Sequence, residues 1–300
     1  MTGQPPGAIA FLGLGLIGGS IAKALAAGRD PVAGAWPQIR AWSPDGRGPA
    51  AARREGVIDI QASSLTEALD GADLIVIAAP PLATIELIGR LGPEMRSVLD
   101  PDALVTDVAS TKGAVMRAAA AADLRFVGGH PMAGREEAGY GASDAGLFRD
   151  RPWVVVSAAA AEPGLAERVH WLATACGARP LDVDAATHDA AVAAISHVPL
   201  VVSAALAEAV SHSAHVDWPL ARSLAASGWE SMTRLARGDA RMGAGIAATN
   251  APAIVAGLRA FRAVLDDWVR DLEAETPDVA ELERRLASVR TRLLDPGTDA

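Results

Sequence analysis

The chain has 300 residues, of which 50% are hydrophobic and 21% are charged, a balance typical of a globular protein with one large or two ordinary domains. Its formal net charge of −9, without a basic cluster, argues against a nucleic-acid partner, because phosphates are bound by groups of Lys and Arg. The single cysteine, Cys176, excludes an intrachain disulfide and a zinc–thiolate cluster, and we expect it to be a small buried residue.

In the first half of the chain, short apolar runs alternate with amphipathic helical segments. This pattern predicts buried strands at residues 8–12, 39–43, 74–79, 103–108, 125–127 and 153–157. Helices are predicted between them at residues 16–27, 65–69, 82–91 and 112–122. Such alternation is typical of right-handed βαβ crossovers, so we expect an α/β fold with a Rossmann-type, mainly parallel sheet.

From about residue 185 onward the sequence contains no convincing strand. Helical apolar spacing extends over residues 185–210, 219–237, 252–274 and 277–294. We therefore expect a dinucleotide-binding Rossmann domain at residues 1–182 and an all-helical substrate and dimerisation domain at residues 183–300. The helical part is rich in Ala, Leu and Val, and burial of its apolar faces favours a homodimer formed through this domain.

The first predicted strand runs directly into the turn Gly13-Leu14-Gly15-Leu16-Ile17-Gly18. In this fingerprint the first glycine permits a tight turn, the second lets a pyrophosphate approach the backbone, and the third lets the helix pack close to the strand. The helix that follows offers free N–H groups and the positive end of its dipole to the phosphates. A glycine-rich turn often only joins a strand to a helix, but this context predicts a dinucleotide site.

The acidic residue that usually follows the second strand and binds the adenosine ribose is absent, and Ser43 stands in its place. Arg47, with Arg53 and Arg54 beyond it, favours a 2′-phosphate. These arginines equally suit an ordinary charged surface, and Asp45 remains an alternative ligand of the ribose. We expect NAD(P) as the cofactor, with a slight preference for NADP.

Polar or proline-containing segments follow three of the predicted strands, at the edge where open α/β sheets bind ligands. Ala79 and Pro80 end the third strand beside the expected cofactor, Ser110 follows the fourth, and His130 follows two glycines after the fifth. A histidine on a tight, uncrowded turn suits a general base that is open to a substrate. From spacing alone, His130 is equally interpretable as a hydrogen-bonded turn residue, and Ser110 as a helix N-cap.

Together these segments closely resemble the prephenate/arogenate dehydrogenase family of tyrosine biosynthesis. The most specific part is the string Gly-Gly-His-Pro-Met-Ala-Gly at residues 128–134, with Ser-x-Lys upstream at residues 110–112. The resemblance covers nearly the whole chain, with further matching segments at residues 13–20, 107–112, 128–139, 147–148, 152–154, 188–189, 196–199, 226–229 and 232–234.

The resemblance implies oxidative decarboxylation of prephenate to 4-hydroxyphenylpyruvate, in which hydride leaves the hydroxyl-bearing ring carbon for the nicotinamide while CO2 departs. It gives His130 the role of base toward that hydroxyl, and Ser110 the role of holding the hydroxyl or His130 in line. It also implies that Arg234 binds a substrate carboxylate through its bidentate guanidinium and that Glu136 tunes the pocket mouth. Two further substrate-side residues are His197 and Gly228.

Some of these positions have a structural alternative. His197 lies on an apolar helix, where a histidine is more often a hydrogen-bonded core residue than a ligand, and Arg234 equally suits an exposed helix position. The pair at residues 188–189 is interpreted as a structural start to the helical domain.

Three substrate-side positions depart from the family pattern. Leu200 replaces the second histidine of a Ser-His-x-Pro-His motif, Ser231 replaces an acidic residue, and Gly243 stands where many relatives have tryptophan. The choice between prephenate and arogenate, which carry a keto and an amino side chain respectively, is left open by these changes, as is inhibition by tyrosine.

Two alternatives from other classes are weaker. A β-hydroxyacid dehydrogenase typically uses a lysine on a helix of its second domain, but the two lysines, Lys23 and Lys112, lie in the first. A non-catalytic dinucleotide-binding module would leave the polar groups around His130 without a purpose. The N-terminus has no basic signal-peptide region, and no uninterrupted apolar stretch of spanning length is apparent, so we expect a cytoplasmic protein without membrane or metal.

Overall fold

The computed structural model describes residues 5–29, 36–135, 137–158, 162 and 164–294. The chain divides into two compact units, Met1–Ile254 and Val255–Ala300. The domain boundary predicted between residues 182 and 183 lies within the first of these units, and it stays a prediction.

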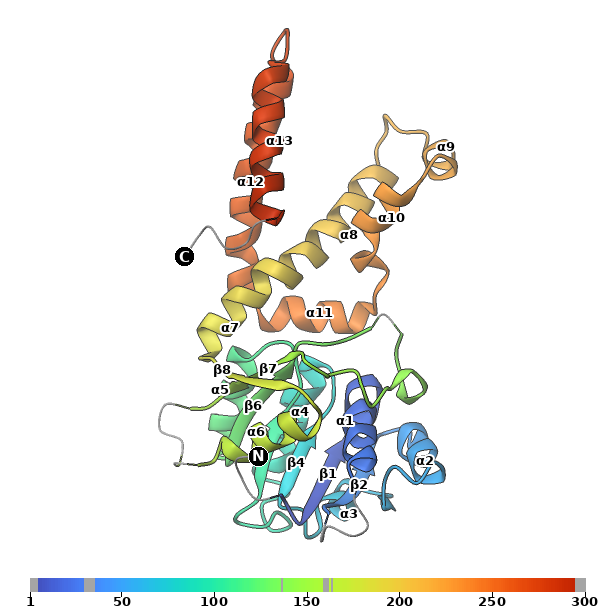
Figure 1. Cartoon of the computed structure of the whole chain (residues 1–300), viewed down its shortest axis with the longest axis vertical. Helices are drawn as coiled ribbons and strands as arrows, with labels where there is room; N and C mark the ends of the chain where they lie inside the picture. Colours follow the sequence, from blue (N-terminus) through green and yellow to red (C-terminus); the bar gives the residue numbers. More distant parts are fainter. Residues whose placement is uncertain (1–4, 30–35, 136, 159–161, 163, 295–300) are drawn as a thin grey trace. The chain divides into compact units, whose positions relative to one another are not determined.

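An eight-stranded sheet with the order β3-β2-β1-β4-β5-β6-β7-β8 forms the centre of the first unit (Figure 1). The strands are β1 (Ala8–Leu12), β2 (Gln38–Trp42), β3 (Ile60–Gln61), β4 (Leu74–Ile77), β5 (Leu104–Asp107), β6 (Phe126–Pro131), β7 (Pro152–Val156) and β8 (Arg179–Asp182). All neighbours pair in parallel except β6 and β7, which confirms the predicted fold class. Strands β3 and β8 were not predicted, because β3 has two residues and β8 is exposed along its length.

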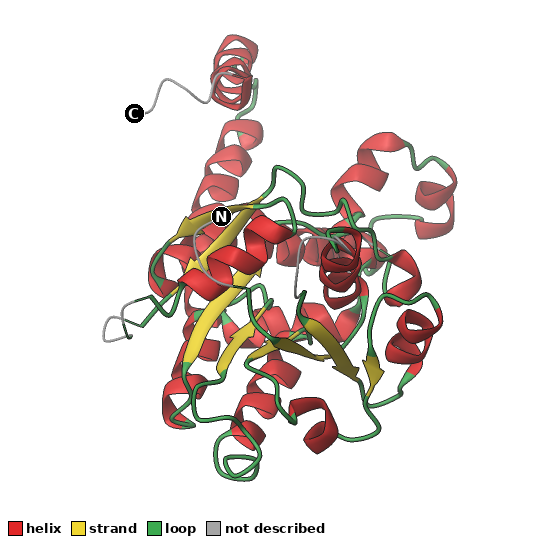
Figure 2. Cartoon of the chain, turned by 60° about the horizontal axis from the view of Figure 1, so that its bottom comes forward, coloured by secondary structure: helices red, strands yellow, loops and turns green. Residues whose placement is uncertain are grey.

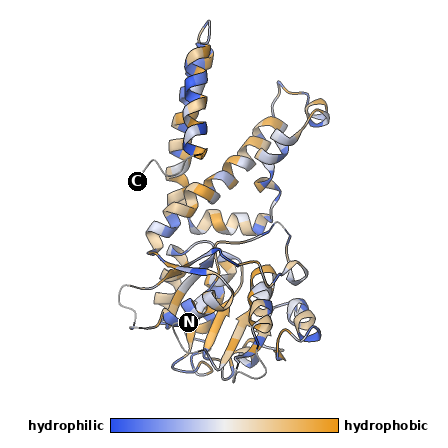
Figure 3. Ribbon diagram, viewed as in Figure 1, coloured by the Kyte–Doolittle hydropathy of each residue, from blue (hydrophilic) through white to orange (hydrophobic). Residues whose placement is uncertain are grey.

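Two hydrophobic cores lie on opposite faces of this sheet. The helices of this part of the chain are α1 (Leu16–Ala27), α2 (Arg47–Arg54), α3 (Leu65–Leu69), α4 (Pro81–Leu91), α5 (Gly113–Ala121) and α6 (Glu167–Ala175). In β1, Ile9 and Phe11 belong to the core under α1 and α6, together with the buried Cys176, whereas Ala10 and Leu12 belong to the core under α3, α4 and α5. Figure 2 shows the helices on both faces, and Figure 3 shows the hydrophobic central strands in orange. A strand buried on both faces is apolar throughout, so continuous apolar runs rather than alternation predict these strands.

The rest of the first unit is helical, as predicted, but it contains more breaks than the apolar spacing indicated. A π-helical turn directly before Pro199, which has no N–H to donate, interrupts the helix predicted at residues 185–210. The side chains of Asp217 and Asp239 cap two further helix starts by accepting from backbone N–H groups. The resulting elements are α7 (Ala185–Val192), α8 (Val198–Ser211), α9 (Trp218–Ser223), α10 (Ser227–Thr233) and α11 (Ala240–Thr249), of which α11 was not predicted.

Among the described residues, the helical stretch Ala185–Ser211 is long and apolar enough to cross a membrane by length and composition, which the sequence analysis did not anticipate. Length and composition alone are weak evidence for a span. This stretch also contains the buried polar residues His188, Asp189 and His197, whose side chains make hydrogen bonds with other parts of the first unit.

The second unit contains most of α12 (Ala251–Glu273) and all of α13 (Val279–Leu294), close to the predicted helices at residues 252–274 and 277–294. Arg285 of α13 joins the two helices. Its guanidinium donates to Asp271 Oδ2 at 2.6 Å and lies 4.0 Å from the centre of the Trp268 ring.

Candidate active site

The glycine turn between β1 and α1 has the shape that a pyrophosphate requires. Gly13 has a φ of +97°, and a Cβ atom there would lie 2.3 Å from the carbonyl oxygen of Ala78. A Cβ at Gly18 would lie 2.7 Å from the carbonyl oxygen of Gly13, so both positions require glycine. Around Gly15, by contrast, a Cβ would meet nothing within 4 Å. The turn is therefore tight on the protein side and open at the glycine that a phosphate approaches.

The residues on either side of this opening fit the same ligand. Leu16 and Ile17 begin α1, whose start has no side-chain cap, so its first N–H groups remain available to an anion. Ala79 and Pro80 follow β4, and the carbonyl oxygen of Ala79 accepts a hydrogen bond from Thr84 Oγ1 at 2.9 Å. This bond fixes the start of α4 next to the glycine turn.

The loop after β2 carries Ser43, Asp45 and Arg47, which contact one another. Ser43 Oγ donates to Asp45 Oδ1 at 3.1 Å, and Arg47 Nε lies 3.6 Å from Asp45 Oδ2. The backbone N–H of Arg47 and the hydroxyl of Ser43 hold the pKa of Asp45 below its usual value. The loop therefore presents both a carboxylate and a guanidinium beside the end of the second strand.

A buried ion pair organises the segment after β5. The ammonium of Lys112 pairs with Asp107 Oδ2 and donates to the carbonyl oxygen of Gly129 at 2.8 Å, and both charged side chains are fully buried. Burial raises the pKa of Asp107 and lowers that of Lys112, and their mutual attraction opposes both shifts. Ser110 is not a helix N-cap, since α5 begins at Gly113 after Lys112. Its hydroxyl is buried and has no hydrogen-bond partner among the described residues.

His130 lies in a strand, and the prediction of a tight turn at this histidine was wrong. It is a residue of β6 and pairs with Val154 of β7. The two preceding glycines serve close packing instead: a Cβ at Gly129 would lie 2.5 Å from the carbonyl oxygen of Asp107, and one at Gly128 would lie 3.1 Å from Lys112 Cδ. The glycines let β6 approach the buried ion pair, which fixes the backbone that carries His130.

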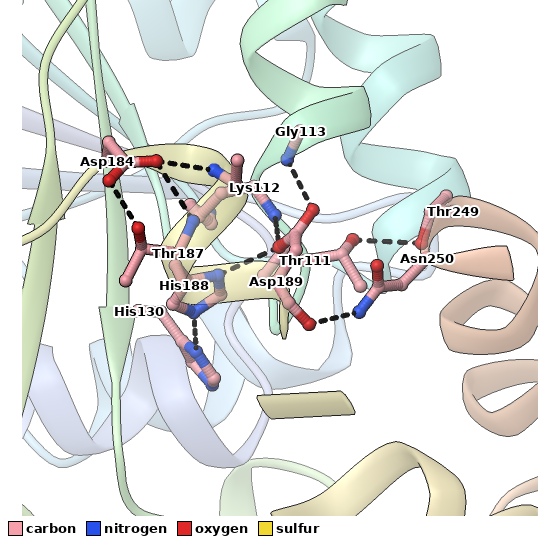
Figure 4. Close-up of polar contacts among 12 residues, drawn as sticks. Thr111, Lys112, Gly113, His130, Asp184, Thr187, His188, Asp189, Thr249 and Asn250 are labelled. Carbon is pink, nitrogen blue, oxygen red and sulfur yellow. Dashed lines mark hydrogen bonds and ion pairs between the residues drawn. The ribbon is translucent and has the colours of Figure 1, made fainter. Parts of the chain in front are cut away.

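The imidazole of His130 contacts His188 directly and is linked through it to Asp189, and neither residue was among the predicted site residues. His130 Nδ1 lies 2.8 Å from His188 Nε2, and His188 Nδ1 lies 2.8 Å from Asp189 Oδ1 (Figure 4). Asp189 also accepts hydrogen bonds from the backbone N–H groups of Lys112 at 2.7 Å and Gly113 at 2.8 Å. The adjacent His-Asp pair does begin the helical region, as interpreted, but it also reaches back to His130.

The pKa values of these groups follow from their surroundings. Burial, the charge of Lys112 and the neighbouring histidines lower the pKa of His130 well below its ordinary value, so this imidazole is neutral near pH 7. Burial alone would raise the pKa of Asp189, but the hydrogen bonds from His188 and from two backbone N–H groups outweigh it and hold that pKa low. The site therefore pairs a neutral histidine with an ionised carboxylate two side chains away.

His197 is a buried, hydrogen-bonded residue, in line with its structural alternative. It ends the π-helical turn, is 1% exposed, and its Nδ1 lies 3.1 Å from the side-chain amide nitrogen of Asn250. Burial lowers its pKa to about 4. The amide of Asn250 also donates to the carbonyl oxygen of Asp189 at 2.8 Å, so this asparagine connects the two segments.

The remaining predicted substrate residues lie in the helical region or outside the described residues. Gly228 is in the first turn of α10, and Arg234 follows the last residue of that helix. Glu136 lies outside the described residues. Within the described part of the chain, no group of three or more His, Cys, Asp or Glu side chains is arranged to hold a metal ion.

Two of the positions that depart from the family pattern lie side by side. A Cβ at Gly243 of α11 would lie 3.7 Å from Leu200 Cδ2 of α8. Ser231 lies apart from them in the sequence, on the exposed part of α10. The two positions therefore belong to one contact between α8 and α11.

Comparison with known proteins gives matches over both parts of the chain. Residues 38–181 match the family model described as the nucleotide-binding domain of prephenate dehydrogenase, and residues 184–287 match the one described as its dimerization domain. A prephenate dehydrogenase from Bacillus subtilis is 30% identical over 268 residues, which cover 88% of this chain and 68% of that protein.

Two further relatives carry related names. A cyclohexadienyl dehydrogenase from Zymomonas mobilis is 29% identical over 271 residues, covering 88% of this chain and 86% of that protein. The crystal structure of Synechocystis arogenate dehydrogenase superposes with a TM-score of 0.75 at 29% identity, covering 95% of this chain and 99% of that one. The fold and the sequence therefore agree in the family to which they point.

Proposed function

The chain belongs to the prephenate dehydrogenase family, and on that premise we propose that it converts prephenate to 4-hydroxyphenylpyruvate and CO2 with transfer of hydride to NAD(P)+. The observation that carries the proposal is the arrangement at the ends of β5 and β6. There the hydroxyl of Ser110 and the Nε2 atom of His130 have no hydrogen-bond partner among the described residues. We propose that the ring hydroxyl of the substrate supplies the hydrogen-bond partner that each of them lacks.

In this mechanism His130 is the base. Its neutral imidazole accepts the proton of the ring hydroxyl at Nε2, and Ser110 Oγ holds that hydroxyl in line by a hydrogen bond. When bound, the nicotinamide ring supplies the acceptor for the hydride that leaves the hydroxyl-bearing carbon. As the bond to the departing carboxylate breaks, its electron pair completes the aromatic ring. His130 then returns its proton to the phenolate oxygen, so the protein ends the cycle unchanged.

The helical region supplies most of the proposed substrate contacts. Arg234 would bind a substrate carboxylate through two parallel N–H···O bonds, with Gly228 in the same helical segment and His197 as a further residue on the substrate side. Glu136, which precedes this region in the chain, is proposed to tune the electrostatics of the pocket. The apolar contact between Leu200 and Gly243 offers no acceptor for an ammonium group. This favours the keto side chain of prephenate over the amino side chain of arogenate.

For the cofactor we propose a preference for NADP+. The support is the exposed guanidinium of Arg47, whose side chain is 88% exposed, next to Ser43 at the end of the second strand. The carboxylate of Asp45 is already engaged by both residues, which weakens it as a ligand of the ribose hydroxyls.

We also propose a homodimer formed through the helical region. Residues 184–287 match a model described as a dimerization domain. The apolar side chains of α12 recur at helical spacing and remain 42–56% exposed at Phe261, Leu265, Val269 and Leu272. A stripe of this kind on a two-helix unit is typical of a surface that a second copy covers.

One set of initial rates tests the proposed reaction, the substrate preference and the cofactor preference together. Prephenate and arogenate are each offered with NAD+ and with NADP+, and we expect prephenate with NADP+ to give the highest kcat/KM. The variant H130N should lose turnover by about 10²–10⁴-fold while its affinity for the dinucleotide, measured by calorimetry, stays within a fewfold of the parent. Normal turnover by H130N, or no turnover of either substrate by the parent, would contradict the assignment.

A further inference from the structure

Three side chains form an unbroken hydrogen-bonded chain through the site: His130, His188 and Asp189. The links are 2.8 Å from His130 Nδ1 to His188 Nε2 and 2.8 Å from His188 Nδ1 to Asp189 Oδ1 (Figure 4). His130 comes from the segment matched to the nucleotide-binding domain, and the other two come from the segment matched to the dimerization domain. The chain therefore connects the base with the helical region.

The direction of each hydrogen bond is set at Asp189. Its carboxylate accepts from the backbone N–H groups of Lys112 and Gly113, and an ionised carboxylate can only accept. His188 must therefore donate to it from Nδ1, which leaves the lone pair of a neutral His188 at Nε2. That lone pair accepts a hydrogen bond from the Nδ1–H group of His130, so the lone pair of His130 lies at its own Nε2.

We propose that His188 and Asp189 are positioning residues that fix His130 in the tautomer whose Nε2 accepts the substrate proton. This inference deepens the proposed function and rests on it. Free histidine favours a proton on Nε2, which would make the outward atom of His130 a donor and useless as a base. In many hydrolases a carboxylate bonded to Nδ1 of the catalytic histidine fixes its tautomer in this way. Here the imidazole of His188 stands between the carboxylate and the base.

A purely structural role does not account for His188. The attachment of α7 to the start of α5 is made by Asp189 through its two backbone contacts, without the imidazole. Yet His188 is only 2% exposed, and its ring meets that of His130 edge-on, with centroids 5.1 Å apart at an interplanar angle of 78°. Its two nitrogens are both used, one toward the carboxylate and one toward the base.

The other charged and titratable groups near the chain are engaged elsewhere. The ammonium of Lys112 is bound by Asp107 and the carbonyl oxygen of Gly129, and Nδ1 of His197 is bound by Asn250. Among the described residues, His188 is therefore the partner that sets the proton of His130. When His130 takes up the substrate proton, the nearest carboxylate along the hydrogen-bonded chain is Asp189, which stabilises the transient imidazolium.

Turnover of three variants tests the proposal. H188L removes the acceptor, H188Q replaces it with an amide oxygen, and H170L is the matched control, because His170 also bonds to a carboxylate, that of Asp182, at 2.9 Å. We expect H188L to lower kcat by about 10²–10⁴-fold with KM for prephenate within a fewfold of the parent. H188Q should recover activity to within about tenfold of the parent, and H170L should match the parent.

A variant at Asp189 provides a readout that loss of packing alone does not move. D189N removes the negative charge that favours the imidazolium, so the acidic limb of the kcat/KM profile should shift to lower pH. A profile that only loses amplitude, with its acidic limb unmoved, would contradict a role for this carboxylate.

The tautomers are measured without any turnover. In protein labelled with 15N-histidine, long-range proton–nitrogen correlation reports which ring nitrogen carries the proton, and H130N assigns the signals of His130. We expect the proton of His130 at Nδ1 in the parent and in H188Q, and at Nε2 in H188L. A proton at Nε2 in the parent, or parental kcat in H188L, overturns the proposal. If the parent oxidises neither prephenate nor arogenate, the proposed function fails, while the tautomer measurement still decides the role of His188.

Discussion

Two glycines of the turn, Gly13 and Gly15, are expected to respond differently to the same substitution. In Gly13→Ala, the new methyl would lie 2.3 Å from the carbonyl oxygen of Ala78 in a backbone with φ of +97°. The left-handed backbone costs about 1–2 kcal/mol and the overlap about 1–3 kcal/mol more, so Tm should fall by roughly 5–15 °C. In Gly15→Ala the methyl meets nothing within 4 Å, so Tm of the cofactor-free protein should stay unchanged. Its methyl instead occupies the space that the pyrophosphate approaches.

Thermal melting with and without the dinucleotide separates these effects. At a ligand concentration of about 100 times Kd, binding stabilises the parent by about 2.7 kcal/mol, which raises its Tm by several degrees. Gly15→Ala should lose roughly half to four fifths of this rise, because an increase in Kd of about ten- to a hundredfold reduces the stabilisation to about 1.4–0.4 kcal/mol. If Gly15→Ala melts like the parent in both conditions, no phosphate approaches Gly15 and the dinucleotide site has been misplaced.

Three further predictions concern the buried ion pair, the buried histidines and the exposed apolar stripe of α12. K112M leaves the carboxylate of Asp107 buried without its partner, so denaturant titration should show a loss of about 3–5 kcal/mol in the free energy of unfolding. The double variant D107N/K112M should recover part of that loss. If the effects of the two substitutions simply add, the two residues are not coupled. The pKa of His197 is lowered to about 4 from 6.5 and that of His130 is also lowered, so the unfolded chain binds more protons below pH 6.5. The free energy of unfolding should therefore be highest above that pH and should fall by about 1.4 kcal/mol per pH unit for each histidine as the pH decreases. A Tm that stays constant between about pH 7 and 5 would refute this pH dependence. In L265D, a charge on the exposed stripe of α12 should convert dimers to monomers in light scattering, and an unchanged mass would exclude that face.

The parts of the fold that the sequence predicts are those governed by local rules. The strand, glycine turn and helix at residues 8–27 could be predicted because the glycine spacing is a local pattern and because every residue of the strand, on either face of the sheet, is apolar. The breaks among the later helices were harder to predict. The helix predicted at residues 219–237 is divided into α9 and α10, and α11, whose start is capped by Asp239, was not predicted.

The error at His130 has a similar origin. Two consecutive glycines predict a turn when only their backbone freedom is considered, but at Gly128 and Gly129 the missing side chains make room for Lys112 and Asp107. That requirement comes from the last residue of β5 and from the segment that follows it, 16 to 22 residues earlier in the sequence. A lysine five residues after an aspartate at the end of a predicted strand was the signal that could have indicated a close approach at this point.

The contact between His130 and His188 joins residues 58 positions apart, and it depends on how α7 docks against the start of α5. Asp189 performs that docking and also orients His188, so one carboxylate both attaches the helical region and sets the protonation of the base. A displacement of α7 that lengthens the bond from His188 to His130 would remove the acceptor that holds the proton of His130 at Nδ1, while the strands of the sheet stay in place. In this arrangement the readiness of His130 to accept a proton depends on the helical region being in place, although His130 itself lies in the nucleotide-binding part of the chain.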